Sequence, residues 1–217
     1  VGVQSFDPRR LELLGRCHTV DQARALARGV EGAAVSLDLI CAIPGQSLDD
    51  WRWELEQAVA LEPSHISAYE LTFHPGTRMT RKMEAGQWTP APEELRVAMF
   101  GETARMLAAA GYEHYEISNH ARPGSRSRHN LVYWELDDFV GLGAGAHSFV
   151  FPHRYVNAND IGAYAEAIRC GRLMRERSDA SDHDMFVLEN LQMAMRLLDG
   201  VDLRRFGGKF GIDMSAT

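Results

Sequence analysis

The sequence contains little cysteine and has no excess of positive charge. Its 217 residues include three cysteines, Cys17, Cys41 and Cys170. They are too few and too widely spaced for a disulfide framework or for a metal site among themselves, so we expect a reducing, cytoplasmic environment. Acidic residues outnumber basic residues by 30 to 23, which gives a net charge of -7. This charge disfavours nucleic acid as a partner, because phosphate backbones attract basic proteins.

Long apolar runs, internal repeats and low-complexity segments are also missing. No apolar run approaches the roughly 18 residues that a bilayer-spanning helix requires, so we predict no membrane span. The contents of 45% hydrophobic and 24% charged residues are ordinary for a globular protein. The chain begins with Val1 inside an apolar, strand-like run and ends soon after a helical pattern. We therefore interpret it as an internal fragment of a longer protein.

Strand and helix patterns alternate over the first third of the chain. Residues 1–6, 35–43 and 65–73 have the character of strands, and helical periodicity separates them. Two of these helical segments follow the N-cap residues Thr19 and Ser47. The order strand–helix–strand–helix–strand predicts an α/β fold, with a parallel sheet or barrel and right-handed crossovers.

The middle of the chain is more mixed, and its end is helical only. Residues 92–110 predict a long amphipathic helix, and residues 112–119 predict a further strand. We place a domain boundary where the pattern becomes purely helical. Residues 1–175 then form the first domain, and residues 176–217 form the start of a small helical domain.

Polar side chains stand near the carboxyl ends of the three predicted strands: Gln4, Asp38, and Glu70 with Thr72. A plain barrel core would place Val, Ile and Leu there, and a buried carboxylate is costly unless it is paired. These positions therefore predict a polar ligand site at the carboxyl ends of the strands. The alternative is a structural ion pair, for example between Asp38 and Arg16.

The densest polar and aromatic cluster is His129-Asn130 followed by Tyr133-Trp134. A histidine beside aromatic rings suits a large flat ligand with a metal centre, such as haem, in which the histidine is an axial ligand. The alternative is a turn that two aromatic residues anchor. The glycine-rich residues 141–145 lack the Lys-Ser/Thr of a phosphate loop, so we expect them to serve close backbone packing or ligand approach.

Seven segments occur in an order that is familiar from one protein family. They are residues 2–6 (GVQSF), 14–18 (LGRCH), 36–46 (SLDLI with IPGQ), 65–72 (HISAYELT), 115–119 (YEISN), 129–134 (HNLVYW) and 141–148 (GLGAGAHS). Together they resemble the radical S-adenosylmethionine (SAM) proteins of the oxygen-independent coproporphyrinogen III oxidase family, and within it the branch of haem chaperones. The resemblance covers about residues 1–175. The tail resembles the start of the family's small C-terminal helical domain.

The resemblance implies the C-terminal part of an open, partial (βα)6 barrel that binds SAM and a 4Fe–4S cluster. By motif, the implied SAM-binding residues are Gln4, Arg16, Asp38, Thr72 and His147. Glu70 is kept as a pocket residue of unassigned role. The family's Cys-x3-Cys-x2-Cys cluster motif is absent from this sequence. We therefore expect the cluster ligands upstream of the chain, no metal ligands within it, and no radical chemistry by the chain alone.

Two functions follow from the resemblance. The first is a haem chaperone that binds haem and delivers it to a client protein, with His129, Asn130, Tyr133 and Trp134 as the haem or porphyrin segment. A homodimer is a further expectation for this function, and the sequence leaves the oligomeric state open. The second is an enzyme that converts coproporphyrinogen III to protoporphyrinogen IX, in which a SAM-derived radical abstracts hydrogen from the propionate groups that are decarboxylated. The segment at 129–134 favours the chaperone.

Overall fold

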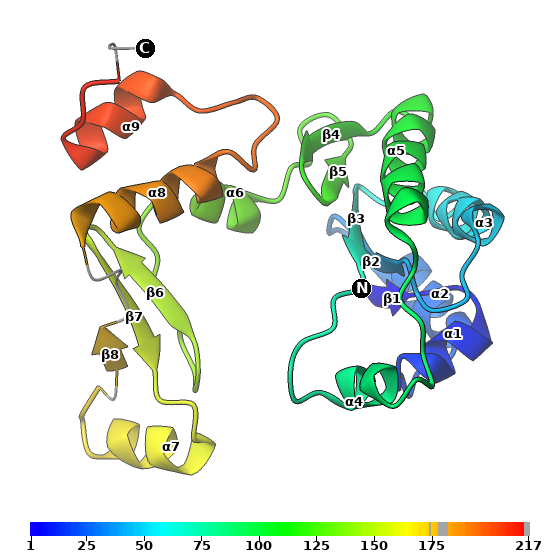
Figure 1. Cartoon of the computed structure of the whole chain (residues 1–217), viewed down its shortest axis with the longest axis horizontal. Coiled ribbons are helices and arrows are strands. Elements are labelled where there is room, and N and C mark those ends of the chain that lie inside the picture. Colours follow the sequence, from blue (N-terminus) through cyan, green and yellow to red (C-terminus); the bar gives the residue numbers. More distant parts are fainter. Residues whose placement is uncertain (174, 178–181, 215–217) are drawn as a thin grey trace. The chain divides into compact units, whose positions relative to one another are not determined.

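The computed structural model describes residues 1–173, 175–177 and 182–214, and its contacts divide the chain into two compact units (Figure 1). The first unit covers Val1–Ser127 and the second covers Arg128–Thr217. This division does not coincide with the predicted boundary at residues 175 and 176. As an assignment of related domains, the boundary at 175 and 176 stays a prediction.

The sheet of the first unit confirms the three expected parallel strands and adds an antiparallel hairpin. Its strands, in spatial order, are β1 (Gly2–Gln4), β2 (Ser36–Cys41), β3 (His65–Glu70), β5 (Asn119–Ala121) and β4 (Glu113–Glu116). β1, β2 and β3 are parallel, whereas β5 runs antiparallel to both β3 and β4. The single strand predicted over residues 112–119 is therefore wrong, because the chain turns back at residues 117 and 118.

Helices connect the parallel strands, as the alternating pattern predicts. They are α1 (Pro8–Leu13), α2 (Val20–Gly29), α3 (Leu48–Val59), α4 (Arg78–Glu84) and α5 (Glu93–Ala109). The predicted N-caps Thr19 and Ser47 are confirmed, since each side chain accepts a hydrogen bond from a backbone N–H group in the first turn of its helix. α5 confirms the helix predicted over residues 92–110, but Val97 and Phe100 are exposed on it, so its apolar residues are not confined to one face. α4 was not anticipated.

Successive side chains of β2 alternate between an apolar core on one face of the sheet and a polar opposite face. Leu37 and Leu39 are fully buried and pack with Ile66 of β3 against the helices on one face of the sheet (Figure 1). In that layer, the Trp51 Nε1 of α3 donates a 2.8 Å hydrogen bond to the Thr103 Oγ1 of α5. Cys41 is buried on the same face, whereas Ser36, Asp38 and Ile40 are half-buried on the opposite face.

A buried cluster of charged residues closes the turn that follows β1. Glu54 of α3 is fully buried and accepts hydrogen bonds from the Ser5 hydroxyl and from the Phe6 N–H group. The Arg10 guanidinium lies 3.6 Å from Glu54 and 2.8 Å from Asp50. Burial raises the pKa of Glu54, while its hydrogen bonds and the charge of Arg10 act in the opposite direction. Arg10 therefore compensates an acidic group that has no contact with solvent.

The second unit joins a small antiparallel sheet to four helices. Its described elements are α6 (Arg128–Trp134), β6 (His147–Val150), β7 (His153–Asn157), α7 (Ile161–Arg169), β8 (Arg175–Arg177), α8 (His183–Ala194) and α9 (Leu203–Phe210). Its core holds Leu136, Phe149, Phe186, Ala194, Phe206 and Phe210. Because these residues come from the loop after α6, from β6 and from α8 and α9, the C-terminal helices and the preceding sheet share one core. This shared core is why the compact units do not divide near residue 175.

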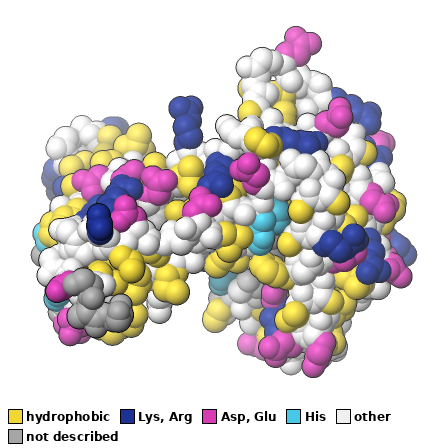
Figure 2. All heavy atoms as spheres, turned by 90° about the horizontal axis from the view of Figure 1, so that it is seen from above, with side chains coloured by type: hydrophobic (Ala, Val, Ile, Leu, Met, Phe, Trp, Pro, Cys, Tyr) yellow, Lys and Arg dark blue, Asp and Glu magenta, His cyan; other side chains and the backbone are white. Residues whose placement is uncertain are grey.

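The surface carries charges of both signs, in keeping with the modest net charge. Figure 2 shows Lys and Arg side chains interspersed with Asp and Glu side chains over the visible face. The longest helix in the described part of the chain, α5, has 17 residues. None of the described helices is both long enough and apolar enough to cross a bilayer.

One histidine of the first sheet is buried without a hydrogen bond. His120 of β5 is 2% exposed, and neither of its ring nitrogens has a partner. Its ring stacks on His114 of β4, with the ring centroids 4.2 Å apart. Burial, and secondarily the nearby His114 and His65, lowers the pKa of His120 to about 3. The imidazole is therefore neutral in the folded protein at ordinary pH.

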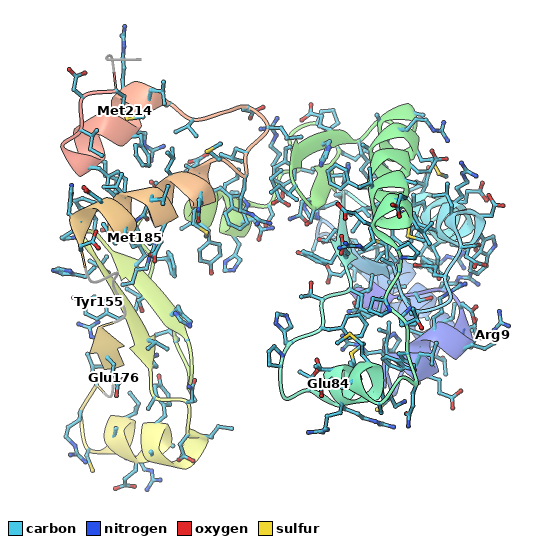
Figure 3. All side chains as sticks on the ribbon, in the orientation of Figure 1. Arg9, Glu84, Tyr155, Glu176, Met185 and Met214 are labelled. Atoms are coloured by element: carbon cyan, nitrogen blue, oxygen red, sulfur yellow. The ribbon has the colours of Figure 1, made fainter. Side chains whose placement is uncertain are left out.

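We predict that Arg10→Ala strongly destabilises the first unit. The variant leaves the buried Glu54 without a compensating charge, a change that costs about 3–5 kcal/mol of unfolding free energy. Urea denaturation measures this loss. The matched control is Arg9→Ala, because the Arg9 side chain is 87% exposed and projects from α1 (Figure 3), so its loss changes stability by no more than about 0.5 kcal/mol. Equal effects of the two variants would contradict the role given to Arg10.

We predict that His120 makes the protein less stable as the pH falls. Between pH 6.5 and about 3 the unfolded state binds a proton that the folded state excludes, so acidification favours unfolding, by up to about 1.4 kcal/mol per pH unit. His120→Phe removes this proton uptake, and the slope of unfolding free energy against pH between 6 and 4 becomes smaller. His74→Phe, at an exposed position, is the control and leaves the slope unchanged. An unaltered slope in His120→Phe would refute the assignment.

Candidate functional site

The polar face of the first sheet brings Gln4 and Asp38 together. The parallel register pairs Gly2 with Asp38, so both residues face the same side. Gln4 has a φ of 66°, and a Cβ atom placed on Gly2 would lie 2.7 Å from the Gln4 Nε2. The Gln4 side chain therefore folds back over Gly2, on the face that carries Asp38. Within the described residues, neither the Gln4 amide nor the Asp38 carboxylate forms a hydrogen bond or an ion pair, which leaves both groups for a ligand.

Glu70 lies on the other face of the sheet. The register pairs it with Cys41, which alternates with Asp38 along β2 and faces the helices. The Glu70 carboxylate forms a 2.7 Å ion pair with Arg96 of α5. Burial, and secondarily the charge of Glu70, raises the pKa of the Cys41 thiol to about 12. This corrects the expectation that Glu70 faces a ligand pocket with Asp38, because pairing with β2 decides which face position 70 occupies.

Arg16 and Thr72 are exposed, and neither contacts Asp38. Arg16 follows α1 and borders a cavity of about 820 Å³ that Arg24 also lines. The structural alternative, an ion pair between Arg16 and Asp38, is not formed. The Thr72 hydroxyl donates a 3.4 Å hydrogen bond to the Glu70 carbonyl. The predicted SAM roles of these residues stay predictions.

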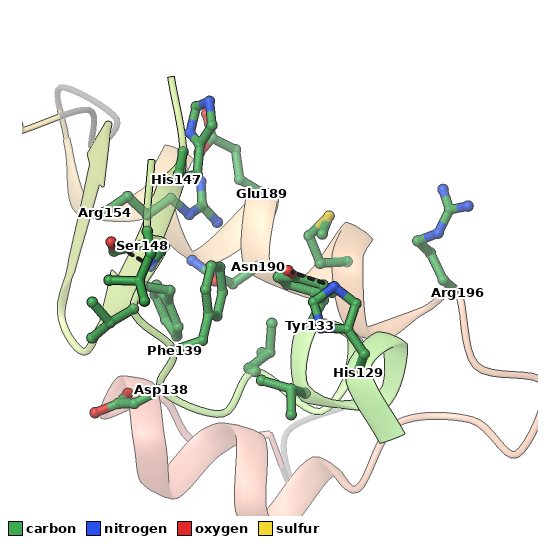
Figure 4. Close-up of a pocket in the computed structure, with 18 of the residues that line it drawn as sticks. His129, Tyr133, Asp138, Phe139, His147, Ser148, Arg154, Glu189, Asn190 and Arg196 are labelled. Carbon is green, nitrogen blue, oxygen red and sulfur yellow. Dashed lines mark hydrogen bonds and ion pairs between the residues drawn. The ribbon is translucent and has the colours of Figure 1, made fainter. Parts of the chain in front are cut away.

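A large cavity opens within the second unit (Figure 4). Its volume is about 1320 Å³, above the roughly 300–1,000 Å³ that pockets for drug-sized ligands usually have. Charged side chains of both signs border it, among them Arg154, which forms an ion pair with Glu189. Its apolar wall includes Val132, Leu136, Phe139, Phe149 and Met193.

Three of the predicted site residues line this cavity: His129, Tyr133 and His147. His129 and Tyr133 lie one turn apart on α6, where the Tyr133 hydroxyl and the His129 Nε2 share a 3.1 Å hydrogen bond. Their rings meet edge to face, with centroids 4.9 Å apart. His147 is the first residue of β6. The structure thus places part of the predicted haem segment in one cavity with a residue that the motif assigned to SAM.

Asn130 and Trp134, the other two residues of the predicted haem segment, are not among the residues that line the cavity. The Trp134 ring instead lies 4.5 Å from the Arg196 guanidinium, which stacks over it. This contact joins α6 to the end of α8 and contributes to packing. For Trp134, the geometry therefore favours the anchoring role that was kept as the alternative.

The glycine-rich loop over residues 141–145 packs closely against β6 and β7. A Cβ atom on Gly141 would lie only 2.1 Å from the carbonyl oxygen of His147. The Asn157 side-chain amide donates hydrogen bonds to the carbonyls of Gly141 (3.2 Å) and Gly143 (2.9 Å). The Gly141 N–H group donates to the Ser148 hydroxyl at 3.0 Å. These contacts confirm the expected close backbone packing, and they fix the loop as one wall of the cavity.

The described residues contain no group of three or more His, Cys, Asp or Glu side chains placed to hold a metal ion. Cys17 and Cys170 are exposed free thiols, and Cys41 is buried. Cys17 and Cys41 belong to the first unit and Cys170 to the second. The three thiols do not form the ligand set of an iron–sulfur cluster in this part of the chain.

Comparison with known proteins identifies relatives over most of the chain. The heme chaperone HemW of Bacillus subtilis is 32% identical over 97% of this chain and 56% of its own length. For the heme chaperone HemW of Escherichia coli, the identity is 34%, over 85% of this chain and 49% of that protein. The mitochondrial radical S-adenosyl methionine domain-containing protein 1 of Danio rerio is 37% identical over 70% of this chain and 35% of that protein. The chain thus spans about a third to just over half of the length of these relatives. No protein-family model matches it.

A solved structure supports the fold. The coproporphyrinogen III oxidase HemN of Escherichia coli, a radical SAM enzyme, superimposes with a TM-score of 0.73 over 97% of this chain and 52% of that chain. The sequence identity is 17%, so this likeness shows the fold alone. The mixed α/β fold is therefore confirmed, and the chain shares it with the matched part of that enzyme. The details of a partial barrel and of a separate helical domain stay predictions.

We predict that Gly141→Ala disturbs the cavity wall. The added methyl group would collide with the His147 carbonyl, and displacing backbone costs about 1–3 kcal/mol of unfolding free energy. Gly208→Ala is the matched control, because Gly208 lies within α9 with open space around it, where alanine stabilises a helix by up to about 1 kcal/mol. Chemical denaturation followed by far-ultraviolet circular dichroism measures both changes. A denaturation midpoint of Gly141→Ala equal to that of the wild type would refute the close approach.

Proposed function

We propose that the chain is part of a haem chaperone, because several relatives that match most of its length are named heme chaperone HemW. In this proposal the cavity of the second unit binds haem, which the protein then delivers to a client protein. One observation carries the proposal: His129 and Tyr133, from the segment that resembles the haem-chaperone motif, line a cavity of about 1320 Å³.

The chemistry of the cavity suits a porphyrin. A porphyrin is a broad, flat and largely apolar ring that carries carboxylate groups on its edge. Val132, Leu136 and Phe139 supply apolar surface for such a ring. The guanidinium groups of Arg154 and Arg196 border the same space, and arginine binds carboxylates with paired hydrogen bonds. The volume of about 1320 Å³ leaves room for a ligand of this size.

We assign SAM to the polar face of the first sheet. Gln4 and Asp38 share that face and have no partners among the described residues. Arg16 and Thr72 are kept as further SAM contacts because of their motifs. The 4Fe–4S cluster expected of a radical SAM protein would reduce SAM when bound. Its ligands would come from outside the described residues, since these hold no suitable cluster of side chains.

The alternative function, the oxidation of coproporphyrinogen III, has support from the fold only. The likeness to the HemN oxidase has 17% sequence identity, whereas relatives that are 32% and 34% identical over 97% and 85% of the chain are named as haem chaperones. We therefore retain the chaperone. A cytoplasmic location and a homodimer remain parts of the proposal. The three free cysteines are consistent with a reducing compartment.

We predict that His129→Ala weakens porphyrin binding. Removing one aromatic contact worth about 0.5–1.5 kcal/mol raises the dissociation constant roughly 2- to 12-fold. Because the contact is with the ring, the effect is the same for ferric haem and for metal-free protoporphyrin IX. Absorbance titration measures both affinities. His183→Ala is the control, since His183 is exposed on α8 and does not line the cavity. If His129→Ala binds both porphyrins with wild-type affinity, His129 does not contact the bound porphyrin.

A further inference from the structure

His147 differs from the other histidine of the cavity in having a free ring. Its side chain is exposed and, within the described residues, makes no hydrogen bond or ion pair. A neutral imidazole carries a lone pair on one ring nitrogen, and this lone pair is what a metal ion binds. Among the histidines that line the cavity, His147 therefore offers a ligand atom without first breaking a contact.

The ring of His129 already contacts another side chain of the cavity. Its Nε2 shares a 3.1 Å hydrogen bond with the Tyr133 hydroxyl on the same helix. The two rings also contact each other edge to face. Ligation of a metal through the Nε2 of His129 would break this hydrogen bond, whereas contact with the edge of a porphyrin ring would leave it intact. The His129–Tyr133 pair therefore fits a role in ring binding.

The backbone that carries His147 is held from two sides. Within the sheet, His147 pairs with Val156 of β7. Its carbonyl oxygen packs against the Cα of Gly141, where no side chain would fit. Asn157 holds the same loop through the carbonyls of Gly141 and Gly143. A side chain on such a fixed strand end loses little backbone freedom when it binds a ligand.

From these observations we infer that His147 is the protein ligand of the haem iron, in place of the SAM contact that its motif implies. This assignment rests on the proposed function, and it gives the two sides of the cavity different roles. In this assignment α6 contacts the porphyrin ring through His129 and Tyr133, and the imidazole of His147 on β6 binds the metal. Figure 4 shows His147 at one side of the cavity and His129 with Tyr133 at the other. A histidine imidazole is a common protein ligand of haem iron. The step is ligation only, in which the imidazole nitrogen donates a lone pair to iron and no electron or group is transferred.

The test compares ferric haem with metal-free protoporphyrin IX, which has the same ring and carboxylates but no iron. For His147→Ala, we expect the affinity for ferric haem to fall at least about tenfold, because loss of even an outer-sphere partner of a metal ligand costs about 10- to 100-fold. The affinity for protoporphyrin IX stays at the wild-type value. The absorption spectrum of the bound ferric haem changes from that of an imidazole complex to that of haem without a protein ligand.

Two further variants make the result specific. His147→Gly leaves space for free imidazole, and added imidazole restores the wild-type haem spectrum. His129→Ala lowers the affinities for both porphyrins to the same degree, and its bound haem keeps the wild-type spectrum. Because His147 is exposed, His147→Ala keeps the thermal unfolding midpoint of the wild type, which circular dichroism verifies.

The outcomes separate this inference from the function on which it rests. If His147→Ala keeps the wild-type haem affinity and spectrum, His147 is not the ligand. If the variant lowers the affinities for haem and for protoporphyrin IX equally, His147 contacts the ring, and the inference is likewise overturned. A wild-type protein that binds neither compound contradicts the proposed function itself.

Discussion

The pairing of β2 with a parallel strand on each side is the constraint on which the first unit depends. Because β2 is held by β1 and β3, its alternate side chains must face opposite layers. Leu37 and Leu39 enter the core against the helices, and Asp38 is left on the polar face. The same register sends Glu70 to the helix side, where Arg96 neutralises it. One pattern of strand pairing thus decides both the core and the polar groups that remain for a ligand.

In the second unit, the corresponding constraint is the close approach of the glycine-rich loop to β6. Gly141 admits the carbonyl of His147 at a distance that no other residue would allow, and Asn157 ties the loop in place. The cavity wall is therefore rigid where His147 projects from it. In the proposed assignment, ring contact at α6 and metal ligation at β6 are separable properties of one cavity. A carrier that must release its ligand benefits from this separation, because the metal bond and the ring contacts can be weakened one after the other.

Short-range rules explain which features could be predicted. The Thr19 and Ser47 caps and the period of α5 depend on residues within a few positions of each other. Prediction failed at the hairpin of β4 and β5, because residues 113–121 include no glycine or proline to mark the turn. It also failed for the face of Glu70, which depends on the partner strand. The helical pattern near the end of the chain is real, but Phe186 and Phe210 pack on Phe149 of the sheet, so helix content alone does not define a compact unit.

Local periodicity and contiguous motifs are enough to predict the parallel strands with their connecting helices, the polar character of Gln4 and Asp38, and the resemblance that points to haem and SAM. Tertiary packing alone places His147 in a cavity with His129 and Tyr133. It also stacks Arg196 on Trp134, which does not line that cavity. The physical reason is that a cavity wall is made by packing between segments far apart in the chain, and no local pattern records which side chains will meet there.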